Sequence, residues 1–218
     1  ADPRKLRAIA LTATSRATSP NISPAKRFGL NENPNDKDTD NEIVHERYHA
    51  TKKLSLVPLG DEEKLDAKLA ALAKEKPGDR AVLVFARSVE TVLKIAAELG
   101  KGDTKGKVAI LTGTMRGKER DELVSGNGDT IPSAATRIFQ RFLAEKDRAP
   151  AIEPATGTVF LVATSAGEVG VNLSADDLVC DLSTYESMAQ RFGRVNRFGR
   201  RNDSSITVVH ENKFESSK

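Results

Sequence analysis

The sequence has a single cysteine, no tryptophan and only two tyrosines in its 218 residues. One thiol cannot form a disulfide within the chain, and Cys180 lies inside the apolar run LVCDL, which predicts a buried core residue. No apolar run approaches the ~18 residues that a membrane-spanning helix requires, and no secretory signal is visible. We therefore expect a cytoplasmic chain without a membrane partner.

The sequence also lacks the motifs that hold nucleotide phosphates and their metal ion. No segment matches G-x-x-x-x-G-K-[ST], the loop that cradles phosphates, and no DExD or DExH cluster offers carboxylates to Mg²⁺. The three histidines have no cysteine or carboxylate partners at ligand spacing, so we expect no metal site. If such a chain serves an ATPase, it supplies only part of the nucleotide site.

Hydrophobic residues make up 38% of the chain and gather in short runs between helical patterns. Several runs are apolar throughout, which is typical of strands buried on both faces of a sheet. Their alternation with helices predicts an α/β domain with a parallel sheet and right-handed crossovers. The expected strands are 8–12, 52–57, 81–85, 107–112, 158–163, 178–182 and 206–210. The expected helices lie between Gly60 and Pro77, between Ser88 and Gly100, and over 135–146.

Loops that follow the strands are where a parallel sheet of this kind binds ligands. Three of them carry hydroxyls, glycines or arginines, namely FARS (85–88), LTGTMRG (111–117) and VATSAGEVGVN (162–172). Hydroxyls and exposed backbone N–H groups at these places can bind phosphate. Each loop taken alone is also compatible with an ordinary helix start or turn.

The segment QRFGRVNR (190–197) carries three arginines around Gly193. On a helix, Gln190, Arg194 and Arg197 would form one stripe at one-turn spacing, with Arg191 partly off it. A solvated basic helix face would tolerate this crowding. A polyanion such as ATP or a nucleic-acid backbone would be bound by it.

The order of these motifs is more specific than any one of them. ALTAT, VFARS, LTGTMRGKER, VATSAGEVGVNL and QRFGRVNR resemble motifs III, IV, IVa, V and VI of superfamily 2 helicases. The ending EVGVNL…DL…QRFGRVNRFGRR is most similar to the helicase–nuclease family of type I CRISPR systems. The resemblance implies a RecA-like fold, with the last strand of a first domain at 1–14, a linker or insertion at 15–50, a second RecA-like domain at 51–212 and a tail at 213–218.

The resemblance also implies roles for individual residues. Arg194 and Arg197 would be arginine fingers that reach ATP held on the first domain, with Gln190 and Arg191 beside the nucleotide. Asn172 replaces the aspartate of many family members and can still hydrogen-bond a ribose. The other implied positions are, toward the nucleotide, Glu168 and Gly170; toward nucleic acid, Arg87, Thr112, Gly113, Arg116, Thr164 and Ser165; and toward domain closure, Thr12 and Thr14.

The function implied is that of the second motor domain of an ATP-dependent translocase on single-stranded DNA. ATP and Mg²⁺ would be its cofactors, with phosphate and metal ligands supplied by the first domain, and a CRISPR surveillance complex would be a further partner. The chain alone is expected to be inactive. An RNA helicase, another superfamily 2 translocase and a non-catalytic RecA-like binding module stay open as alternatives, because nothing in these loops distinguishes DNA from RNA by a 2′-hydroxyl contact.

Overall fold

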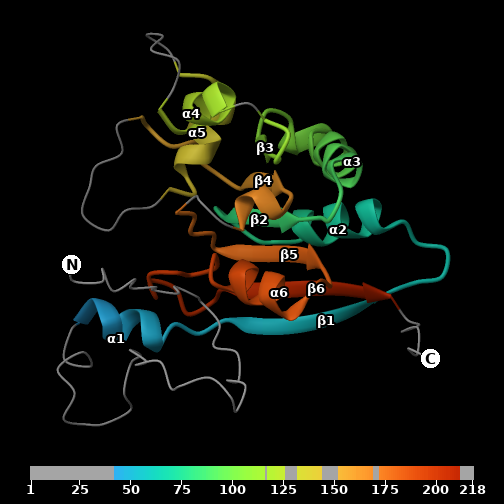
Figure 1. Ribbon diagram of the computed structural model, residues 1–218, viewed down its shortest axis with the longest axis horizontal. Helices are drawn as coiled ribbons and strands as arrows, with labels where there is room; N and C mark the ends of the chain where they lie inside the picture. Colours follow the sequence, from blue (N-terminus) through green and yellow to red (C-terminus); the bar gives the residue numbers. More distant parts are fainter. Residues whose placement is uncertain (1–41, 116, 126–131, 144–151, 169–171, 212–218) are drawn as a thin grey trace, which may run out of the picture.

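The computed structural model describes residues 42–115, 117–125, 132–143, 152–168 and 172–211 (Figure 1). The predicted strand 8–12 lies outside this part of the chain. The strands are β1 (Lys53–Leu59), β2 (Ala81–Phe85), β3 (Val108–Leu111), β4 (Val159–Ala163), β5 (Asp177–Asp181) and β6 (Ser205–Glu211). The α-helices are α1 (Glu42–Tyr48), α2 (Leu65–Lys74), α3 (Val89–Leu99), α4 (Gly117–Ser125), α5 (Ala134–Gln140) and α6 (Tyr185–Phe192), with 3-10 turns η1 (Gly102–Thr104) and η2 (Ser165–Gly167).

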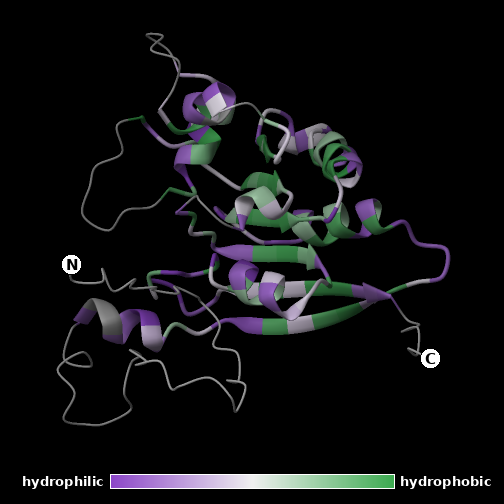
Figure 2. Ribbon diagram, viewed as in Figure 1, coloured by the Kyte–Doolittle hydropathy of each residue, from purple (hydrophilic) through white to green (hydrophobic). Residues whose placement is uncertain are grey.

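The six strands form one sheet in the order β1-β6-β5-β2-β4-β3, and every pair in it is parallel. Strands β2, β4 and β5 are buried at every position, as the unbroken apolar sequences of β2 and β4 predict, and β5 has an aspartate at each end of its apolar centre. Figure 2 shows these strands as hydrophobic and the helices around them as mixed. The predicted α/β architecture with a parallel sheet is confirmed.

Helices cover both faces of the sheet and enclose two apolar layers. One layer receives Leu69 of α2 and Ile95 of α3, and the other receives Ile138 of α5 and Met188 of α6. Helix α3 has the predicted ends, because the Ser88 hydroxyl accepts the N–H of Thr91 and Gly100 follows the last turn. None of the described helices is long and apolar enough to span a membrane.

Three predicted helix boundaries were wrong. Helix α2 begins at Leu65 rather than near Gly60, because the Glu63 carboxylate accepts the Gly60 N–H and closes a separate turn. Helix α5 ends at Gln140, short of the predicted residue 146. Helix α6 ends at Phe192, so the predicted helical stripe of Gln190, Arg194 and Arg197 does not form. Helix α1 forms within the predicted linker.

Candidate functional site

Motifs that follow β3 and β4 meet at the carboxyl edge of the sheet. The Gly113 N–H after β3 donates to the Thr164 hydroxyl after β4 at 3.4 Å, and the Thr164 N–H donates to the Leu111 carbonyl at 3.1 Å. The hydroxyls of Thr112 and Thr114 lie 2.9 Å apart. Thr112 and Thr164 are buried, whereas Gly113 and Ser165 are exposed at this edge. Exposed polar groups from two adjacent loops therefore face solvent together.

Arg191 of α6 connects the loop after β4 to the end of β5 through a buried ionic network. Its side chain is only 2% exposed, and its Nε donates to Glu168 Oε1 at 2.8 Å. Its Nη1 donates to Asp181 Oδ1 and to the Asp181 carbonyl, both at 2.9 Å. The Ser187 hydroxyl donates to the other Glu168 oxygen at 3.0 Å. Burial lowers the pKa of Arg191, but its hydrogen bonds to the Glu168 and Asp181 carboxylates raise it by more. The pKa of Arg191 therefore lies above its ordinary value.

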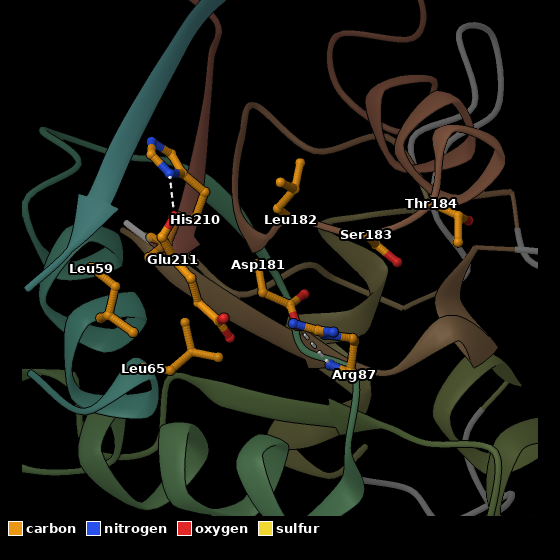
Figure 3. A pocket seen from close by; sticks show the side chains of 10 residues that line it. Leu59, Leu65, Arg87, Asp181, Leu182, Ser183, Thr184, His210 and Glu211 are labelled. Carbon is orange, nitrogen blue, oxygen red and sulfur yellow. Dashed lines mark hydrogen bonds and ion pairs between the residues drawn. The ribbon is translucent and has the colours of Figure 1, made fainter. Parts of the chain in front are cut away.

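Arg87 extends this network to the end of β2. Its Nε donates to Asp181 Oδ2 at 3.0 Å, so Asp181 lies between two arginines. The Arg87 side chain is 62% exposed and forms one wall of a pocket of about 640 Å³ (Figure 3). The carboxyl ends of β1, β5 and β6 and the start of α2 line the rest of the pocket, so it lies at the end of the sheet where parallel α/β sheets bind ligands.

The backbone of the arginine segment after α6 lies away from the carboxyl edge of the sheet. We call residues 193–201 the finger loop. Val195 pairs with Ala175, which precedes β5, and the Asn196 amide donates to the carbonyl of Thr51, which precedes β1. A helix that leaves the carboxyl edge runs back along the strands, so its last turn lies near the opposite edge.

Arg194 and Arg197 differ from the other arginines near them. Arg194 is 8% exposed, and its Nη2 donates to the backbone carbonyl of Glu168. Within the described ranges, neither Arg194 nor Arg197 makes an ion pair with a carboxylate. Burial, and then repulsion by Arg197, lowers the pKa of Arg194. Two neighbouring guanidinium charges are thus left unmatched by the described part of the fold.

The remaining predicted positions are partly described. Gln190 is partly buried on α6, and Asn172 is exposed ahead of β5. Thr12, Thr14, Arg116 and Gly170 lie outside the described residues. Asp181 and Asn196 were missed in the sequence, where the only signals were a carboxylate closing an apolar strand and an asparagine between two arginines. No three His, Cys, Asp or Glu side chains of the described ranges come together as a metal site.

The parallel sheet and the contacts between its loops define a RecA-like domain of the kind that forms the C-terminal half of a helicase motor. A crystal structure of T. fusca Cas3 with ADP matches with a TM-score of 0.54 and 16% identity, over 77% of this chain and 19% of that one. The C-terminal domain of the DEAD-box protein Dbp5 matches with a TM-score of 0.50 and 20% identity, over 75% and 78% of the two chains. These likenesses establish the fold.

The particular family follows from the sequence. A family model described as CRISPR-associated nuclease/helicase Cas3, C-terminal, matches residues 78–200, which is more than half of the chain. The chain belongs to this family, and the predicted resemblance is confirmed at that level. No curated protein matches the chain. The chain spans about a fifth of the T. fusca Cas3 chain, with 19% covered.

Proposed function

We propose that this chain is the second motor domain of an ATP-dependent translocase on single-stranded DNA that acts in CRISPR interference. Arg194 and Arg197 would contact the phosphates of ATP bound, with Mg²⁺, to a first RecA-like domain of the same polypeptide. Gly113, Ser165 and Arg87 would contact the phosphodiester backbone. The proposal thus assigns two functions to two surfaces of the domain, one beside α6 and one at the carboxyl edge.

The observation that carries the proposal is the unmatched arginine pair. An arginine that is only 8% exposed and has no carboxylate partner among the described residues retains an unfavourable buried charge. A phosphate placed against Arg194 and Arg197 would neutralise that charge and accept hydrogen bonds from both guanidinium groups. ATP supplies a phosphoryl group on which negative charge must be stabilised during transfer, and a guanidinium from outside the phosphate loop can do this.

The ionic network supports the same assignment. Arg191 connects Glu168 of motif V to Asp181 at the end of β5, and Arg194 donates a hydrogen bond to the Glu168 carbonyl. Glu168, in the loop that would contact nucleic acid, therefore also contacts Arg194 of the loop that would reach ATP. A shared residue gives a short physical route by which the two ligands could influence each other.

The test compares ATP hydrolysis by the full-length protein that carries this chain, with and without single-stranded DNA. In Arg194→Ala/Arg197→Ala we expect turnover to fall on the order of 10³-fold or more, with DNA affinity retained. Arg137→Ala/Arg141→Ala on and after α5 is the matched control, because it also removes two positive charges but should hydrolyse ATP normally. Normal hydrolysis by the finger variant would favour a binding module. Stimulation by RNA but not by DNA would favour an RNA helicase.

A further inference from the structure

The finger loop is held on one side by the segment that precedes β5. The Ala175 N–H donates to the Arg194 carbonyl at 2.7 Å, and the Asn196 N–H donates to the Ala175 carbonyl at 2.8 Å. The Arg197 N–H donates to the Ser174 hydroxyl at 3.3 Å. The backbone of both candidate fingers is therefore fixed against the chain that follows motif V.

The segment that enters β1 holds the other side. The Lys52 ammonium donates to the Phe192 carbonyl at 2.9 Å, at the end of α6. Arg47 of α1 lies 5.1 Å from the ring centre of Phe198, a contact of cation–π type. Figure 1 shows α1 beside the start of β1. We call the contacts of residues 46–52 with residues 192–201 the clasp.

Asn196 and Gly199 are the two residues of the finger loop that the clasp needs. Asn196 is the one non-glycine residue with positive φ in the described ranges, at 42°, and it is 4% exposed. Its amide donates to the carbonyls of Thr51 at 3.3 Å and Arg201 at 2.6 Å, and its oxygen accepts the Arg201 N–H at 3.1 Å. Asparagine tolerates this backbone conformation better than most residues, and three hydrogen bonds stabilise it.

Gly199 allows α1 to approach the loop closely. Its φ is +71°, and a Cβ atom placed on it would collide with the backbone carbonyl of Glu46. A side chain at this position would have to displace either α1 or the loop. The contact is between two backbones, so a flexible side chain cannot relieve it.

We infer that Asn196 and Gly199 are positioning residues for ATP hydrolysis, and that residues 46–52 act on the fingers through them. The inference rests on the proposed function, because it assumes that Arg194 and Arg197 contact ATP. Residues 46–52, Asn196 and Gly199 do not themselves touch the nucleotide. It fixes the backbone from which both guanidinium groups extend, so a shift in the chain ahead of β1 would move the fingers.

The test is Gly199→Ala in the full-length protein, with Gly106→Ala as its matched control. Gly106 has a similar φ of +74°, but nothing lies within 4 Å of the place a Cβ would take. Both variants carry the strain of a left-handed alanine, and only Gly199→Ala displaces the clasp. We expect kcat to fall on the order of 10²-fold in Gly199→Ala and by less than about twofold in Gly106→Ala, with the KM for ATP and the affinity for single-stranded DNA little changed in both.

A double-mutant cycle separates positioning from general destabilisation. If Gly199 acts through the fingers, Gly199→Ala should lower the residual turnover of Arg197→Ala much less than it lowers that of the wild type. Asn196→Gly keeps the backbone conformation and removes the amide bonds, so it should show the same pattern if Gly199→Ala fails to fold. Additive effects, or equal kcat in Gly199→Ala and Gly106→Ala, would overturn the inference. Normal kcat in Arg194→Ala/Arg197→Ala would instead overturn the proposed function.

Discussion

At the amino-terminal edge of the sheet, arginines and carboxylates match one another. Arg80 donates to Asp177 at 2.7 Å and to Asp203 at 2.6 Å, and Arg201 donates to Asp203 at 2.9 Å. Asp177 also accepts the N–H and hydroxyl of Ser205. These contacts tie the beginnings of β2, β5 and β6 together, and the fold itself accounts for each charge.

The arginines of α6 and the finger loop that come before Arg200 fall into two groups. Arg191 is matched by Glu168 and Asp181, as Arg80 is by its partners. Arg194 and Arg197 have no carboxylate partner in the described ranges, although they lie in the same short segment as Arg191. The comparison shows that proximity in sequence does not make arginines equivalent. A guanidinium that pairs with carboxylates of the fold can be retained for its contribution to stability. A buried guanidinium without such a partner points instead to an anionic ligand.

The largest expected effect comes from removing the matched arginine nearest the fingers. Arg191→Leu leaves the buried Glu168 carboxylate without a cation and Asp181 with Arg87 alone, and should lower the free energy of unfolding by about 3–5 kcal/mol. Arg80→Leu should cost less, because Ser205 still donates twice to Asp177 and Asp203 is solvated. Urea unfolding of the 218-residue chain measures both.

Adding Glu168→Gln to Arg191→Leu serves as the control. The neutral amide removes the Glu168 charge, which Arg191→Leu leaves without a cation, whereas Asp181 keeps Arg87, so part of the lost stability should return. Equal losses in Arg191→Leu and Arg80→Leu, with no recovery in the double variant, would contradict the idea that the buried network near α6 is the stronger restraint.

A smaller effect is expected from pH at the amino-terminal edge. Burial alone would raise the pKa of Asp177, but hydrogen bonds from Arg80 and Ser205 and the charge of Arg80 outweigh it and hold the pKa below its ordinary value of 3.8. A depressed pKa in the folded state stabilises the fold above 3.8, and this contribution is lost as the pH falls below it. The difference in unfolding free energy between wild type and Asp177→Asn should therefore shrink between pH 5 and pH 2, as measured by urea titrations. A constant difference would mean that Asp177 contributes by packing alone.

The central strands and α3 could be predicted from the sequence because their signals are local. An unbroken apolar run marks β2, and Ser88 and Gly100 mark the ends of α3. The end of α6 was missed because the predicted stripe of arginines continued the helix through Gly193, although glycine after a last turn also ends helices. What decides between these readings is the pairing of Val195 with Ala175, a contact between segments distant in sequence.

The roles of the arginines were predictable only in part, for the same reason. The spacing of QRFGRVNR marks the segment as a candidate anion site, but it does not show that Arg191 has carboxylate partners and Arg194 has none among the described residues. That distinction depends on Glu168 and Asp181, which reach the segment through other strands. Pairing of charges across a fold is a tertiary property, and a single sequence carries no local signal for it.

The smallest effect on stability is expected from the exposed arginine of each network. Of these two arginines, only the one at the carboxyl edge should affect DNA binding. Arg87 is 62% exposed and Arg201 is 34% exposed, and each pairs with a carboxylate, so Arg87→Ala and Arg201→Ala should change stability little.

Only Arg87 lies at the edge proposed to hold the DNA backbone. In the full-length protein, Arg87→Ala should weaken binding of single-stranded DNA several-fold across sequences. It should also lower the slope of log Kd against log salt concentration by about 0.7, the share of one phosphate contact. Arg201→Ala removes the same charge and should leave that slope unchanged. Equal changes in both variants would show that Arg87 acts through net charge, and the proposed path of the strand over the carboxyl edge would then lose its anchor at β2.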